Sequence, residues 1–188
     1  MRYVLMSKRI LRKDQTQELI DGIENLLKLL RNHNLRQQGS LVGQLGELLV
    51  YLKILDVDNH AEILSGQSGT DIKMSNGCRI EVKTGSRSKT EGGIFGFGRI
   101  KPEKFHFCVC VALKEPPEFF IFSKKQANNL PTEYEARGKK VRYNGSEIEK
   151  VFHYYDGNLE GRSCDKLIQI NKNIEDYQDW DQIGNTMK

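Results

Sequence analysis

Hydrophobic residues first recur at helical spacing near the start of the chain. Leucine and isoleucine positions three or four residues apart run through residues 14–31, and a second run of this kind spans Ser40–Ile54. Such spacing places apolar side chains on one face of a helix. The pattern predicts two helices with Asp14 and Ser40 as their N-terminal caps. Gly43 and Gly46 each weaken the second helix by about 1 kcal/mol, so we expect it to pack closely on another backbone.

Shorter apolar runs after the second helix predict the strands of a sheet. The Asn76-Gly77 pair favours a tight hairpin turn between two of these strands. Residues 85–104, with five glycines, are predicted to form a long polar loop, and 167–170 a short strand or turn. The expected strands are His60–Leu64, Ile72–Met74, Arg79–Val82, Phe105–Leu113 and Phe119–Phe122, and further helices are expected over Lys124–Leu130 and Asn173–Trp180.

This order of elements predicts an α/β fold with a central mixed β-sheet flanked by helices. The 188 residues contain no repeat and no long linker, so we expect a single domain. Its core is expected over residues 40–130, with the helix of residues 14–31 before it. A C-terminal extension, 132–188, has no predicted role.

Composition argues against a disordered chain, and the distribution of apolar residues argues against a membrane span. Charged residues make up 29% of the chain and hydrophobic residues 38%, which is typical of a globular protein in solution. A net charge of +4 permits nucleic-acid binding without requiring it. There is no secretory signal and no apolar run of about 18 residues, so we expect a cytoplasmic protein without a membrane span.

The cysteines have no zinc-binding spacing. Cys108 and Cys110 alternate along an apolar run and are predicted to share the buried face of a strand. His106, in the same run, is predicted to be a core histidine.

The predicted hairpin brings charged groups together. Asp71 stands ten residues before Glu81, and Lys83 follows two residues later, so Glu81 and Lys83 share one face of their strand. Adjacent carboxylates repel each other unless a cation lies between them. Mg²⁺ accepts one or two carboxylates and keeps several waters, and a nearby lysine suits a phosphate. The spacing therefore predicts a metal-dependent phosphodiesterase site.

These residues resemble the PD-(D/E)xK nuclease superfamily, which includes restriction-endonuclease-like enzymes and archaeal Holliday-junction resolvases. The resemblance covers residues 43–83. Gly43–Glu47 is similar to the first core helix with its acidic residue, Ser65–Asp71 to the loop that delivers the aspartate, and Glu81–Lys83 to the (D/E)xK element. Thr70 stands where the motif has its proline.

The resemblance implies a restriction-endonuclease-like core and a catalytic role for each matching residue. Asp71 and Glu81 would bind Mg²⁺ (or Mn²⁺ in its place), with the carbonyl of Val82 as a further ligand. Lys83 would be the catalytic lysine, and Glu47 an additional acidic ligand, direct or through water. The implied activity is that of a DNA endonuclease, in the first instance a type II restriction enzyme acting on double-stranded DNA.

The segment after Lys83 carries the cations that we expect to contact DNA: Arg87, Lys89, Arg99, Lys101 and Lys104. Phe95 and Phe97 lie among them, and two interpretations are open. They either enter a groove or stack on a base, or they fold the segment onto the core. A second basic stretch, 137–142, and the pair Lys124-Lys125 are weaker candidates.

Other interpretations stay open. The nuclease could be a structure-selective enzyme such as a junction resolvase, or a catalytically silent DNA-binding module of the same fold. The motif could also be coincidental, with Glu81 and Lys83 a solvated ion pair, Asp71 a turn cap and Glu47 an exposed helix residue. The leucine-rich stripe of residues 14–31 fits either a cover for the sheet or a homodimer interface.

Overall fold

The computed structural model describes residues 11–32, 39–64, 70–86, 93–132, 149–156 and 165–187. The helices are α1 (Lys13–Asn32), α2 (Gly39–Ile54), α3 (Lys124–Asn129), α5 (Asp165–Lys172) and α6 (Asp181–Gly184), with short 3₁₀ turns at Pro102–Lys104, Ile174–Tyr177 and Asn185–Met187. The strands are β1 (Glu62–Ile63), β2 (Ile72–Lys73), β3 (Arg79–Ser86), β4 (Ile94–Ile100), β5 (Phe107–Leu113), β6 (Glu118–Ser123) and β7 (Lys150–Tyr155).

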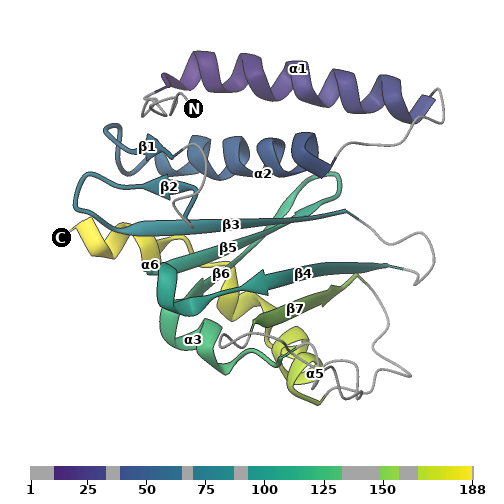
Figure 1. The fold of residues 1–188 in the computed structure, drawn as a ribbon, viewed down its shortest axis with the longest axis vertical. Coiled ribbons are helices and arrows are strands. Elements are labelled where there is room, and N and C mark those ends of the chain that lie inside the picture. Colours follow the sequence, from purple (N-terminus) through teal and green to yellow (C-terminus); the bar gives the residue numbers. More distant parts are fainter. Residues whose placement is uncertain are drawn as a thin grey trace, which may run out of the picture.

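The central sheet is mixed, with five strands in the order β1-β2-β3-β5-β6. Among the strands that the structure describes in this sheet, β3 and β5 pair in parallel, and the other neighbours are antiparallel. A second, two-stranded antiparallel sheet is formed by β4 and β7. Helices lie on both sides of these sheets (Figure 1), which confirms the predicted α/β architecture with a mixed sheet flanked by helices.

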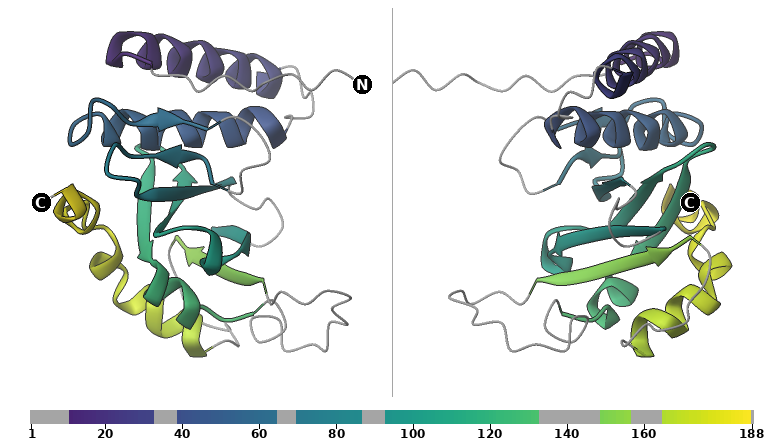
Figure 2. Two further views of the ribbon diagram at one scale, coloured as in Figure 1. Left: turned by 60° about the vertical axis from the view of Figure 1, so that its left-hand side comes forward. Right: turned by 90° about the vertical axis from the view of Figure 1, so that its right-hand side faces the viewer.

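The elements form stacked layers (Figures 1 and 2). Helix α1 lies outermost on α2, α2 covers one face of the central sheet, and β4, β7 and α5 lie beyond the other face. Each interface between layers buries its own apolar cluster. The cluster between α1 and α2 includes Ile20 and Leu45, the cluster under α2 includes Tyr51 and Val109, and the cluster between the two sheets includes Phe97, Phe120 and Phe152.

Of Gly43 and Gly46 in α2, only Gly46 explains the expected close packing. A Cβ atom on Gly46 would lie 1.9 Å from Oγ1 of Thr84 on β3, whereas a Cβ on Gly43 would meet nothing within 4 Å. Helix α2 therefore approaches β3 at the residue just before Glu47. This contact sets the height of Glu47 above the sheet.

The hairpin is confirmed as predicted. The Gly77 N–H donates to Met74 O at 2.9 Å, and Gly77 has φ +84°, a conformation that favours glycine. The Asn76 side chain accepts the Cys78 N–H at 2.8 Å, which closes an Asx turn. The turn chemistry thus fixes the register of β2 on β3, with Ile72 opposite Ile80.

The predicted polar loop over residues 85–104 is wrong for most of its described length. β3 runs on to Ser86, Ile94–Ile100 is strand β4, and Pro102–Lys104 is a 3₁₀ turn. Phe95 and Phe97 are fully or almost fully buried and stack on Tyr154 and Phe152 of β7. Since these rings fill the core, the interpretation that they insert into DNA is wrong.

Two smaller expectations also differ from the structure. Leu167–Ile170 lies within helix α5, because Leu167 and Ile170 pack together on the cluster between the sheets. β5 begins at Phe107, so His106 is exposed, and its Nδ1 accepts the Arg79 N–H at 3.0 Å. In contrast, Cys108 and Cys110 are buried on one face of β5, as predicted.

The described part of the C-terminal segment packs against the rest of the fold. Trp180 packs edge-to-face on Phe119 of β6, and Ile183 is buried under α2. The Asn76 side chain of the hairpin turn donates to Thr186 O at 2.7 Å. Within the described ranges, no helix is long and apolar enough to cross a membrane.

Candidate functional site at the edge of strand β3

The site forms where β2 separates from β3. The two strands pair only at Ile72–Ile80 and Lys73–Arg79, whereas β3 continues to Ser86 alongside β5. Beyond Ile80, β3 thus has a paired strand on its β5 side only, among the residues that the structure describes. Glu81, Val82 and Lys83 lie on this open stretch.

Asp71 makes hydrogen bonds to β3 at this open edge, where the backbone of a further strand would otherwise pair. Its Oδ2 accepts the Val82 N–H at 2.6 Å, and its own backbone N–H donates to Ile80 O at 3.1 Å. Burial, followed by the nearby charge of Glu81, raises the pKa of Asp71 from its ordinary 3.8 to about 6. The carboxylate bonds a neighbouring strand rather than its own turn, which argues against a turn cap.

Glu81 and Lys83 form an ion pair that is largely withdrawn from solvent. Lys83 Nζ donates to Glu81 Oε1 at 2.5 Å, and the side chains are 24% and 14% exposed, respectively. Burial lowers the pKa of Lys83, but the charge and hydrogen bond of Glu81 outweigh it, so the pKa lies above the ordinary value. Lys83 is therefore a cation near neutral pH, and a solvated surface pair does not describe this contact.

Glu47 approaches the same edge from helix α2. Burial raises its pKa from the ordinary 4.5 to about 7, and the charges of Asp71 and Glu81 add to this effect, while Lys83 opposes it. The half-buried Glu47 is therefore electrostatically coupled to each of the other three charged groups. The structure brings together all four side chains that the sequence analysis selected.

The coupled acids make stability depend on pH. Since Glu47 and Asp71 have folded-state pKa values above their ordinary ones, the folded protein binds these protons more tightly than the unfolded chain. Their stabilising contribution is complete below about pH 4 and is lost as the pH rises to about 7. We expect the metal-free protein to become less stable from pH 5 to pH 8.

Glu47→Gln removes one of these titrating groups. Between pH 5 and pH 8, the free energy of unfolding of this variant should therefore fall by about 1 to 2 kcal/mol less than that of the wild type. Urea denaturation at four pH values measures the difference. Parallel curves for the two proteins would contradict the assigned coupling.

The oxygen atoms at this edge can supply part of the coordination shell of a hard divalent cation. Glu81 Oε2 is buried without a hydrogen-bond partner in the described structure, and such an oxygen can accept a hydrogen bond or bind a cation. The N–H and C=O of one residue in a strand point to the same side, so the Val82 carbonyl faces the side of Asp71. Among the described residues, no three His, Cys, Asp or Glu side chains are close enough to hold one metal ion. Two carboxylates and a carbonyl can hold Mg²⁺, which retains waters.

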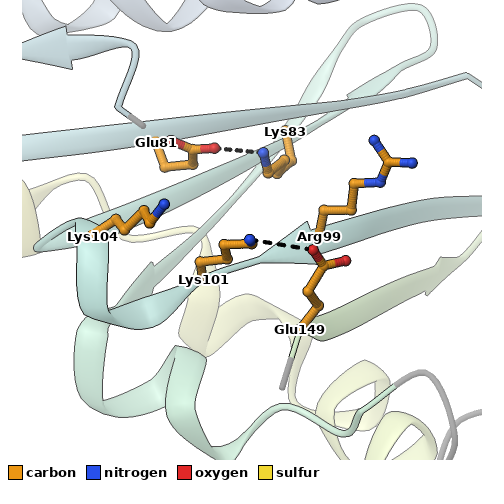
Figure 3. A pocket seen from close by; sticks show the side chains of 6 residues that line it. All are labelled: Glu81, Lys83, Arg99, Lys101, Lys104 and Glu149. Carbon is orange, nitrogen blue, oxygen red and sulfur yellow. Dashed lines mark hydrogen bonds and ion pairs between the residues drawn. The ribbon is translucent and has the colours of Figure 1, made fainter. Parts of the chain in front are cut away.

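A pocket of about 490 Å³ opens beside this edge, between β3 and the strand pair β4–β7 (Figure 3). Glu81 and Lys83 form one wall, and the others are Arg99, Lys101, Lys104 and Glu149. Three of the predicted DNA-contacting cations are thus at the site. Arg87, Lys89 and the basic stretch 137–142 lie outside the described residues, while Lys124 and Lys125 border a different pocket near the hairpin turn.

Two features of the pocket escaped the sequence analysis. Glu149, just before β7, pairs with Lys101 at 3.4 Å, and nothing in its sequence context linked it to residues about fifty positions earlier. Cys108 and Cys110 on β5 lie in register with Glu81 and Lys83, and are therefore beside the ion pair on the same face of the sheet. Burial raises the pKa of Cys110 far above its ordinary value, so this thiol stays neutral beside the site.

Comparison with models of known protein families gives no match, and no curated protein sequence matches the chain significantly. The functional argument therefore depends on the side chains of this site and on their arrangement.

Proposed function

We propose that the protein is a Mg²⁺-dependent DNA endonuclease that hydrolyses phosphodiester bonds at the open edge of β3. The observation that carries the proposal is the convergence of Asp71, Glu81 and Lys83, with Glu47 beside them, next to a pocket rich in cations. The charge of Glu81 raises the pKa values of Glu47 and Asp71, and acids clustered in this way suit a cation. The lysine and arginine side chains suit a phosphate.

Asp71 and Glu81 are the residues that would hold the cation, together with the carbonyl of Val82. Glu47 would act through water, since the described acids do not form a three-membered metal cluster. A bound Mg²⁺ supplies charge neutralisation at the phosphate and makes a water molecule nucleophilic near neutral pH.

Lys83 has a role that does not depend on binding the cation. Its ammonium group is held by Glu81 at the pocket wall, where it can donate to a non-bridging phosphate oxygen as negative charge develops. Because the pKa of Lys83 lies above its ordinary value, the lysine stays protonated and acts as a hydrogen-bond donor rather than as a base.

The kind of endonuclease is decided by its substrate. A long loop after Lys83 would favour recognition of one DNA sequence and hence a type II restriction enzyme, but most of the described part of that segment is strand β4. A junction resolvase with the same site is therefore an equal alternative.

The test is cleavage of plasmid and branched DNA with Mg²⁺ by the wild type, Asp71→Ala and Lys83→Ala. Discrete plasmid fragments that both variants fail to produce would support a restriction enzyme, and cutting confined to branched DNA a resolvase. Cleavage that is unchanged in the variants would contradict the site.

A catalytically silent module is distinguished by metal-dependent stability. We expect Mg²⁺ or Ca²⁺ to raise the thermal midpoint of the wild type, since an ion at 100 times its dissociation constant stabilises the folded state by about 2.7 kcal/mol. The gain should be greatest at pH 8, where Glu47 and Asp71 are ionised.

Asp71→Asn should remove most of this gain, while Asp14→Asn, an exposed acid of α1, should retain it. Differential scanning fluorimetry with and without the cation gives the comparison. An equal midpoint with and without cation in the wild type would favour the silent module.

A further inference from the structure

The cations of the pocket differ in whether a carboxylate neutralises them. Lys83 and Lys101 each pair with a glutamate of the pocket, at 2.5 and 3.4 Å. Within the described part of the chain, Arg99 and Lys104 form no ion pair. The four cations and two carboxylates of the lining thus leave two positive charges that the pocket does not balance internally.

Arg99 has a backbone conformation that arginine rarely adopts. Its φ is +57°, and it lies in a bulge of β4, where the register with β7 shifts between Phe97 and Ile100. A Cβ atom disfavours this left-handed conformation, and bulges commonly redirect a side chain next to a functional site. Backbone strain that is retained at the wall of a pocket indicates a function for the side chain it directs.

The two unbalanced cations reach the pocket from opposite sides. In Figure 3, Lys104 points in from the side of Glu81, and Arg99 lies beyond Lys83 on the other side. In this view, Glu81 and Lys83 lie between them. A DNA strand carries phosphates on both sides of any internal bond, and contacts to these phosphates position the strand without reading its sequence.

We propose that Arg99 and Lys104 bind the backbone phosphates on the two sides of the cleaved bond, so that the site accepts an internal segment of a DNA strand. This inference rests on the proposed function, because it names the substrate segment that the same site takes. The guanidinium of Arg99 can donate to two phosphate oxygens at once, while Lys104 contributes a point charge.

Binding tests the inference without hydrolysis. We would measure the affinity of a fluorescent DNA duplex by anisotropy over a range of salt concentrations, with Ca²⁺ in place of Mg²⁺. Arg99→Gly removes the guanidinium and suits the left-handed backbone, so its thermal midpoint should not fall. Lys104→Met keeps most of the apolar stem, and Lys172→Met, an exposed lysine of α5 outside the pocket, is the matched control.

Each pocket variant should weaken binding and reduce the magnitude of the slope of log affinity against log salt by about 0.9. Lys172→Met should match the wild type in both respects. Slopes that are unchanged in Arg99→Gly and Lys104→Met, equal losses in Lys172→Met, or a wild type that does not bind DNA would overturn the inference.

Failure of the proposed function gives a different result. If the expected slope changes occur in a protein that does not cut DNA with Mg²⁺, the phosphate contacts stand and the hydrolytic function falls. In a protein that does cut, covalently closed circular DNA tests the internal segment. Cutting of the circle supports it, and release of nucleotides only from the ends of linear DNA overturns it.

Discussion

Lys83→Met is expected to lower the rate of Mg²⁺-dependent DNA cleavage by about 10²- to 10³-fold, as is typical when one preorganised donor to a developing charge is removed. Methionine keeps the length and apolar character of the side chain but loses the ammonium group. The lost contact is the one between Lys83 and a phosphate oxygen, so the effect should lie in the rate under saturating DNA. Single-turnover cleavage measures it directly.

A comparison with the matched variant Glu81→Gln distinguishes the role of Lys83 from that of the metal site. It should also lose cleavage, but it should lose the Mg²⁺-dependent gain in thermal stability as well, since Glu81 carries the unpartnered buried oxygen. Lys83→Met should keep that gain or increase it, because a cation that competes with Mg²⁺ for Glu81 has been removed. Equal loss of the metal effect in both variants would contradict the separate roles.

Gly46→Ala is expected to destabilise the protein by about 1 to 3 kcal/mol, the usual range for overpacking. The added Cβ would lie 1.9 Å from Thr84 Oγ1, so either α2 or β3 must move. Any such movement displaces Glu47, and cleavage should fall in the protein that remains folded. Urea denaturation and the cleavage rate report the two effects.

The second glycine of α2 supplies the control. A Cβ on Gly43 meets nothing within 4 Å, so Gly43→Ala should stabilise the helix by up to about 1 kcal/mol. Thr84→Ala removes the nearest atom and should partly rescue Gly46→Ala. Opposite signs for the two glycine variants are the expected result, and equal destabilisation would show that helix propensity, rather than contact with β3, governs Gly46.

The elements that the sequence predicted are those fixed by local chemistry. Helices α1 and α2 follow from apolar residues at helical spacing, and the hairpin follows from Asn76-Gly77, whose turn the backbone confirms. The pair Glu81 and Lys83 on one face follows from the two-residue period of a strand. Each of these features depends on residues within a few positions of one another.

Strand β4 could not be predicted in this way. Its bulge at Gly98 and Arg99 breaks the alternation of buried and exposed residues, and the strand with which it pairs, β7, begins fifty residues later. The same long-range pairing buries Phe95 and Phe97, which a local view leaves on a polar loop. Helix α5 was missed because its apolar residues, Leu167, Ile168 and Ile170, fall within four positions, like those of a short strand.

The sequence selects the residues of the candidate site but does not predict the structure that surrounds them. Spacing selected Asp71, Glu81 and Lys83, and the resemblance to the nuclease superfamily added Glu47. The structure brings them to one edge of the sheet. In the described structure, this edge of β3 is open because β2 pairs with β3 at only two positions. The sequence does not show where that pairing ends. Glu149 and the strained backbone of Arg99 likewise depend on the pairing of β4 with β7.

The measurement that tests the central claim most directly is the initial rate of plasmid cleavage with Mg²⁺, for the wild type and Lys83→Met side by side. Lys53→Met, an exposed lysine near the end of α2, controls for the loss of a positive charge. The account predicts Mg²⁺-dependent cleavage by the wild type and by Lys53→Met, and a rate lower by at least about 10²-fold in Lys83→Met. No cleavage by the wild type of plasmid or branched DNA, or equal rates in all three proteins, would contradict it.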